Sequence, residues 1–217
     1  MDAAQVERAL RHSRDFLVAA GLDSRVLRGE RPTKAIAPLS PHHRDVQQYL
    51  RTALSSTAPA PETDPLLLFS RFRPQRARLV GDVVKTRGRL AYREGKRGAV
   101  EATADVTCVY PVTPVGDGGR DAEVRRTIVR REVVMSGDDP AEVVAEPGTM
   151  PLVSYALDMT DGGCSARTGC FLPPFGAADE NPADEAHQID PYDRSEPING
   201  SNGPTAKVNG CATATRS

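Results

Sequence analysis

Hydrophobic and polar residues alternate strictly between Ala99 and Tyr110. The even-numbered residues from Val100 to Tyr110 are apolar or aromatic, and Glu101, Thr103, Asp105 and Thr107 fall between them. This period of two is typical of a β-strand with one buried face and one solvent-exposed face. The pattern therefore predicts a strand over 99–110, with the side chains of Val106 and Cys108 pointing into the core and Asp105 pointing toward water.

The first 55 residues have the longer period of amphipathic helices. Apolar residues from 3 to 20 share one side of a helix, and Gly21 follows where a left-handed C-terminal stop is expected. Ser40 and Pro41 resemble an N-cap with proline in the first turn, which predicts a second helix over about 41–55.

Residues 58–65, rich in proline and alanine, read as a linker that separates the helices from a sheet over 66–159. The apolar run 66–72 predicts a first strand. Residues 78–92 predict a longer strand with bends or bulges at its two glycines, Gly81 and Gly88.

The second half of the sheet starts after a hairpin loop at 93–97 and the diagnostic strand. Residues 123–135 predict a strand whose apolar residues change face, and this favours a bulge near Arg130 and Arg131. The last predicted strand is 151–159.

Two helices followed by antiparallel strands predict an α+β fold, with the helices packed on one face of a curved sheet. We expect one domain over 1–160. Residues 161–217 lose all periodicity and are rich in Gly, Pro and Asp, so we expect a long irregular tail, partly disordered or tethered by disulfides. With 39% hydrophobic residues, 5% aromatic residues and no Trp, the core should be modest and aliphatic.

Charge is distributed unevenly although the net charge is −1. Residues 1–135 hold 24 Lys and Arg against 16 Asp and Glu, whereas residues 136–217 hold 4 against 13. A basic body with an acidic tail indicates either internal screening or a partner that competes for the basic surface. The sequence has no apolar run of the ~20 residues that a membrane-spanning helix needs, and no apolar signal core near its start.

The order of elements resembles the cystatin-like and nuclear-transport-factor-like α+β folds. Several segments also resemble uncharacterised envelope proteins of actinobacteria such as Streptomyces, which combine a membrane anchor, one such domain and a Cys-containing tail. The matching segments are 14–20 with Leu22 and Asp23, 83–89, 108–110, Asp190-Pro191-Tyr192, and Cys211. The resemblance implies an extracytoplasmic location if an anchor precedes this chain, and a cytoplasmic one otherwise. It carries no catalytic residues to transfer.

Cysteine usage is compatible with an oxidising compartment. Cys108 falls on the buried face of its strand, where a free thiol behaves as a small hydrophobe. We expect a disulfide among Cys164, Cys170 and Cys211, with free thiols in a cytosolic protein as the alternative. Their spacing fits no zinc site, so we expect no metal.

Catalytic signatures are absent from the sequence: it has no nucleophile elbow, P-loop or dinucleotide fingerprint, and we expect no cofactor. The resembled fold often encloses a cone between sheet and helices, which tyrosines and carboxylates can line. Tyr92, Tyr110 and Tyr155 are the candidate pocket-lining residues. Asp105 and Asp158 fall on the opposite faces of their strands from the apolar residues, which disfavours an enzyme.

An Arg-rich sheet surface is the remaining candidate site. Its proposed contact residues are Arg87, Arg89, Arg126 and Arg130. Few aromatic residues lie among these arginines, and the net charge is not basic, which argues against nucleic acid as the partner.

The sequence therefore favours a non-enzymatic interaction or scaffold domain of the bacterial cell envelope, whose partner is another envelope protein or a second copy. A small-molecule binder or enzyme using the cone is the alternative, and nucleic-acid binding through the Arg-rich face is a weaker one.

Overall fold

The computed structural model describes residues 2–116, 123–137, 146–163, 168–176, 188–195, 197–198 and 209–214. The helices are α1 (Ala3–Gly21), α2 (Ser24–Leu27), α3 (Thr33–Ile36) and α4 (Arg44–Ser55). Among these described helices, none is both long and apolar enough to cross a bilayer.

The start of α1 is fixed by a capping box. The Asp2 carboxylate accepts from the Gln5 backbone N–H at 2.7 Å, and the Gln5 side chain accepts from the Asp2 N–H at 2.8 Å. The predicted stop at Gly21 is wrong, because Gly21 is still helical and Leu22 forms the cap. The second long helix begins at Arg44, a few residues later than predicted.

The apolar run after the linker is not a strand, contrary to prediction. The linker contains a short 3₁₀ turn, η1 (Pro61–Thr63). The run itself begins in a second one, η2 (Pro65–Leu67), and continues as a buried loop. Leu66 to Phe69 are all at most 4% exposed. Such a short apolar run cannot be distinguished from a buried strand by periodicity, because burial on all sides removes the alternation.

Strands β1 to β5 form an antiparallel sheet, so the α+β class is confirmed. These strands are β1 (Ala77–Leu79), β2 (Lys85–Glu94), β3 (Val100–Pro114), β4 (Arg125–Gly137) and β5 (Leu152–Thr160), with a 3₁₀ turn η3 (Lys96–Gly98) between β2 and β3. The order is β1-β3-β4-β5-β7-β6, and β2 pairs with β3 beside β1. The short strands β6 (Gln188–Ile189) and β7 (Asn209–Ala214) extend the sheet in parallel.

Two predicted details of the strands need correction. The single strand over 78–92 is two strands, β1 and β2, separated at Gly81, whose φ is +72°. No bulge occurs at Arg130 and Arg131, because β3 and β4 pair in unbroken register there. The change of face in β4 arises because Ile128 and Val129 point to opposite faces and both faces are buried.

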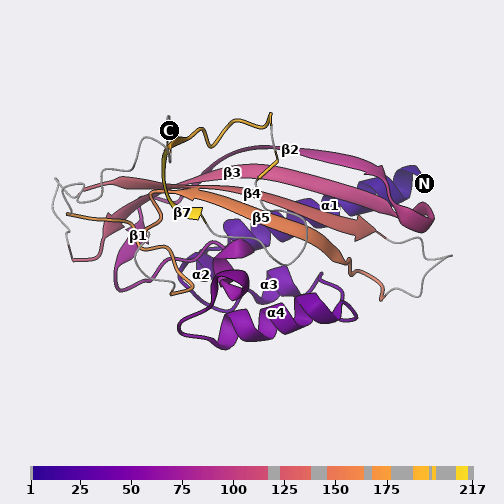
Figure 1. Cartoon of the computed structure of the whole chain (residues 1–217), viewed down its shortest axis with the longest axis horizontal. Helices are drawn as coiled ribbons and strands as arrows, with labels where there is room; N and C mark the ends of the chain where they lie inside the picture. The colour runs from indigo at the N-terminus through magenta and orange to yellow at the C-terminus, as the bar shows by residue number, and fades with distance from the viewer. Residues whose placement is uncertain are drawn as a thin grey trace.

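The helices cover one face of the sheet, which we call the inner face (Figure 1). Helix α1 runs along β3 and β4, and α4 packs beyond η2. The core between these layers is built from the fully or nearly fully buried side chains Phe16, Tyr49, Leu67, Phe69, Tyr110, Met135, Leu157 and Phe171.

The opposite, outer face of the sheet is also covered. Asp105 and Thr107, predicted to face water, are each 1% exposed, since the segment 190–195 lies against them. Phe171, from the predicted tail, is 0% exposed and lies 5.1 Å from Phe72, ring centre to ring centre. The described parts of 161–217 therefore pack on the domain.

Candidate functional site

Strand β2 is an edge strand. It pairs with β3 along its whole length, and no described strand pairs with its other side. All ten of its residues are exposed. In an antiparallel pair every second residue directs its N–H and C=O toward the neighbouring strand, so the remaining residues of β2 direct theirs to the open edge.

The two faces of β2 differ in chemistry. Pairing with Asp105 and Thr107 of β3 places Lys85, Arg87, Arg89 and Arg93 on the outer face. The inner face carries Thr86, Gly88, Leu90 and Tyr92. Leu90 and Tyr92 are 42% and 52% exposed, although they lie on the side that elsewhere forms the core.

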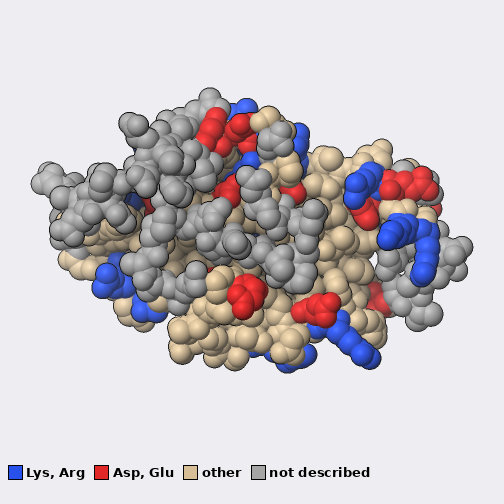
Figure 2. Space-filling view, in the orientation of Figure 1, with Lys and Arg blue, Asp and Glu red and all other residues tan. Residues whose placement is uncertain are grey.

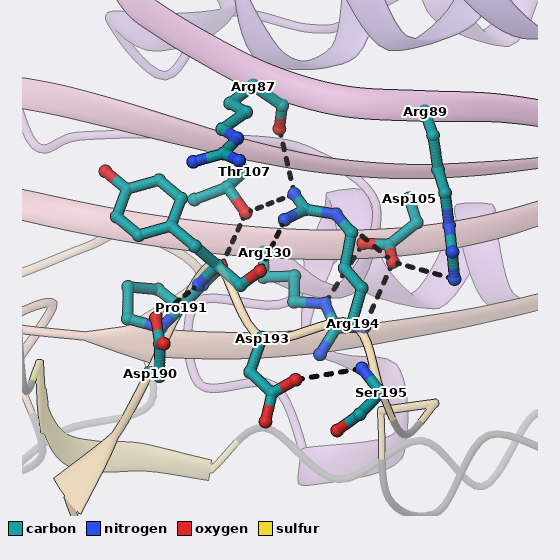
Figure 3. Close-up of polar contacts among 11 residues, drawn as sticks. Arg87, Arg89, Asp105, Thr107, Arg130, Asp190, Pro191, Asp193, Arg194 and Ser195 are labelled. Atoms are coloured by element: carbon teal, nitrogen blue, oxygen red, sulfur yellow. Dashed lines mark hydrogen bonds and ion pairs between the residues drawn. The ribbon is translucent and has the colours of Figure 1, made fainter.

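On the outer face, the Asp105 carboxylate is the centre of a buried charge network (Figure 3). Arg130 binds it with two parallel hydrogen bonds, both 3.0 Å long. Arg194 Nε lies 3.4 Å and Arg89 Nη2 lies 3.9 Å from Asp105 Oδ2. A bidentate arginine–carboxylate pair is among the strongest polar contacts, so Arg130 is committed to Asp105.

The C-terminal segment completes this network (Figure 3). Thr107 Oγ1 donates to the Pro191 carbonyl at 2.7 Å. Arg194 donates to the Arg87 carbonyl and to Thr107 Oγ1, each at 2.9 Å. The Arg87 guanidinium lies 5.8 Å from the centre of the Tyr192 ring, within cation–π range. The outer face of β2 is thus linked to residues about a hundred positions later in the sequence.

Burial and the charges of this network shift the pKa values of the residues around it. Burial and then the Asp105 charge raise the pKa of Glu132. Burial raises the pKa of Asp158, which lies opposite Arg130 on β5, against the lowering effect of the Arg130 charge. Burial lowers the pKa of Arg130, but its bonds to Asp105 outweigh this effect, and its pKa ends above the usual value.

On the inner face, a pocket of about 250 Å³ lies between α1 and β2. Its apolar lining comes from Leu17, Val18, Leu22, Leu90 and Val106. Arg14, Arg89, Arg131 and Cys108 also line it, and none of the described acidic residues does. Among the described residues, no cluster of His, Cys, Asp and Glu could hold a metal ion.

The structure separates the three tyrosines predicted to line a cone. Tyr110 is fully buried and donates to the Gly21 carbonyl and contacts Ser70 Oγ, at 3.0 and 2.8 Å. Tyr155 packs at 5.5 Å from Tyr49. Tyr92 lies exposed on β2, and none of the three lines the pocket between α1 and β2.

The predicted basic residues do share one face. Arg87, Arg89, Arg126 and Arg130 all lie on the outer face, where they pair across the ladders with odd-numbered residues of β3. Arg130 is buried against Asp105, however, whereas Arg87, Arg89 and Arg126 are exposed. In Figure 2, basic and acidic side chains of the described residues lie next to one another at the end of the sheet where β2 and β3 join.

The predicted disulfide remains a prediction. Cys164 and the side chain of Cys211 lie outside the described residues, and Cys170 bonds to no described cysteine. Burial raises the pKa of Cys170 and of Cys108.

Two arginines of these sites are not among the residues predicted from the sequence. Arg131 lines the inner-face pocket, and Arg194 belongs to the Asp105 network. The alternation in β4 places Arg131 on the inner face with Val129 and Val133, which was a usable signal. Arg194 lies in a segment without periodicity, and its role depends on that segment folding back against Asp105 and Thr107 of β3.

Comparisons with protein-family models, with curated proteins and with solved structures gave no match. Function has therefore to be inferred from β2 and its surroundings.

Proposed function

We propose that this chain is a non-enzymatic protein-interaction domain that binds an extended acidic segment of another protein along the open edge of β2. The observation that carries this proposal is the exposure of all ten β2 residues in an edge strand. An edge of this length presents a row of backbone donors and acceptors that an extended peptide can pair with.

Charge on β2 disfavours pairing with a second copy. In a two-fold antiparallel pair that continues the sheet, outer-face residues of one strand lie opposite outer-face residues of the other. The outer-face residues of β2 are Lys85, Arg87, Arg89, Ala91 and Arg93, so such pairs bring cations together. Like charges directly opposite one another are destabilising.

The alternation of cations on the outer face of β2 favours a partner strand with acidic residues at every second position. A strand with Asp or Glu at every second position would lie opposite the cations of the outer face. Its intervening residues would lie on the inner face beside Leu90 and Tyr92, which expose apolar surface there. Cross-strand pairs of opposite charge and apolar–aromatic pairs each contribute ~0.2–1 kcal/mol, so we expect a moderate affinity that falls with added salt.

The fold family and the cellular location are proposed from resemblance. Helices packed on one face of an antiparallel sheet are compatible with a cystatin-like or nuclear-transport-factor-like fold, which we propose as the finer classification. The resemblance to actinobacterial envelope proteins supports an envelope partner and an extracytoplasmic location, which the cysteine experiment in the Discussion tests.

The test uses a peptide that alternates Glu with Val or Leu, and a control peptide of the same composition with the acids grouped at one end. We expect the alternating peptide to bind and to slow hydrogen exchange of β2 amides. The double variant Lys85→Glu with Arg87→Glu should abolish binding, whereas Arg51→Glu, an exposed charge reversal on α4, should not.

Two results would contradict the proposal. One is equal binding of the alternating and grouped peptides, which would indicate charge attraction without strand pairing. The other is peptide binding that leaves the exchange of β2 amides unchanged. A stable dimer whose interface protects β2 would favour self-association instead.

A further inference from the structure

The inner face of β2 borders the pocket described above, and one of the residues that line the pocket is a buried arginine. Arg131 is 3% exposed and lines the pocket. Its guanidinium donates to the carbonyls of Leu67 and Leu66, at 3.1 and 2.9 Å, and to Ser70 Oγ at 3.3 Å. All three acceptors are neutral.

No carboxylate of the described residues lies within ion-pair distance of Arg131. The two other arginines that border the pocket do have acidic neighbours. Arg14 lies 2.8 Å from Asp15, and Arg89 directs its guanidinium to the outer face, 3.9 Å from Asp105. Arginine is not deprotonated in proteins, and a buried charge is normally paired with an opposite one. Within the part of the chain that the structure describes, the Arg131 charge therefore has no counter-ion.

Other polar groups converge at the same place. A β-carbon added to Gly21 would lie 3.3 Å from Tyr110 Oη and 4.0 Å from both Arg131 Nη1 and Cys108 Sγ. Burial raises the pKa of Tyr110 well above its usual value and raises that of Cys108, so both groups are neutral near pH 7 and neither balances Arg131. The absence of a side chain at Gly21 keeps this space open.

We propose that the pocket binds a small molecule with an apolar body and one carboxylate, which pairs with Arg131. The apolar body would contact Leu17, Leu22, Leu90 and Val106 along the pocket walls. The volume of about 250 Å³ is below the ~300–1,000 Å³ usual for ligand sites, which favours a single short or medium acyl chain over a two-chain lipid. The pocket shares Leu90 with the inner face of β2, but the inference goes beyond the proposed peptide binding and its test uses no peptide.

The test compares octanoate, 1-octanol and octylamine, which share a chain and differ in head-group charge. The chain has no Trp, so Val18→Trp, at an exposed position that lines the pocket, supplies a single tryptophan whose fluorescence reports binding. We expect 1:1 binding of octanoate, with octanol and octylamine roughly 10- to 100-fold weaker, the range expected from one charge-assisted contact.

Two variants locate the ligand. Arg131→Gln removes the charge but keeps a donor, and should weaken octanoate binding to the level of octanol. Val106→Phe fills the pocket, and should weaken all three ligands. If Arg131→Gln does not fold, the comparison of the three ligands and the Val106→Phe variant still test whether the pocket binds a carboxylate.

The proposal is wrong if the three ligands bind equally, if octanoate does not bind, or if folded Arg131→Gln protein binds octanoate as well as the parent protein. Octanoate binding that Val106→Phe leaves unchanged would place the ligand elsewhere and would also overturn it.

Discussion

Replacing Asp105 with Asn tests whether the outer-face network stabilises the fold. Asp105 is 1% exposed and Arg130 is 6% exposed, and their two hydrogen bonds are both 3.0 Å long. Asn retains one acceptor but leaves the buried Arg130 charge without its main partner. Breaking a buried pair from one side costs ~3–5 kcal/mol, and the nearby Glu132 and Asp158 should reduce this loss to ~2–4 kcal/mol.

Urea denaturation measures the effect. With a slope of ~2 kcal/mol per molar urea, a loss of ~3 kcal/mol lowers the midpoint by ~1.5 M. The matched control is Glu101→Gln, the same kind of change on the same face of β3. Glu101 pairs at 2.6 Å with Arg93, whose side chain is 75% exposed, so its loss should cost less than ~1 kcal/mol. Equal shifts for the two variants would refute the reasoning.

Three further predictions concern neighbouring residues. Asp158→Asn should raise the free energy of unfolding at pH 7, because the raised folded-state pKa of Asp158 means that its ionised form destabilises the fold. This gain should shrink as the pH falls toward ~4, where Asp158 becomes protonated. Urea titrations that show no gain at pH 7 would contradict the prediction. Gly88→Ala should lower the free energy of unfolding by ~1–3 kcal/mol, since the added β-carbon would lie 2.5 Å from the Asp105 carbonyl oxygen. A melting temperature equal to that of the parent protein would contradict this close approach of β2 and β3. In native protein isolated from its own cells without reductant, two of Cys164, Cys170 and Cys211 should resist alkylation until reduction, as intact mass reports; immediate labelling of all accessible thiols would contradict the envelope location.

Elements with one buried face could be predicted from the sequence. Helix α1 and strand β3 each have a clear period, and their observed limits lie close to the predicted ones. Prediction failed where burial came from an unforeseen neighbour. The run from Leu66 to Phe69 is enclosed on all sides, so its composition did not reveal its shape.

The candidate site was only partly predictable for the same reason. The sequence grouped Arg87, Arg89 and Arg130 on one sheet surface, but the burial of Arg130 depends on Arg194 and Asp105 meeting across the folded sheet. No local pattern encodes a contact between segments so far apart. The open edge of β2 also depends on which strands pair, and the periodicity of a single strand does not specify its neighbours.

The return of the C-terminal segment to β3 has a consequence for the order of folding. The Thr107–Pro191 and Thr107–Arg194 hydrogen bonds join residues 84 and 87 positions apart. Contacts this distant in the chain form late, because a long loop must close first. During synthesis, β1 to β5 can therefore pair while Asp105 is still hydrated. We expect a chain that ends before Pro191 to leave Asp105 in contact with water, because the segment that covers it would be missing.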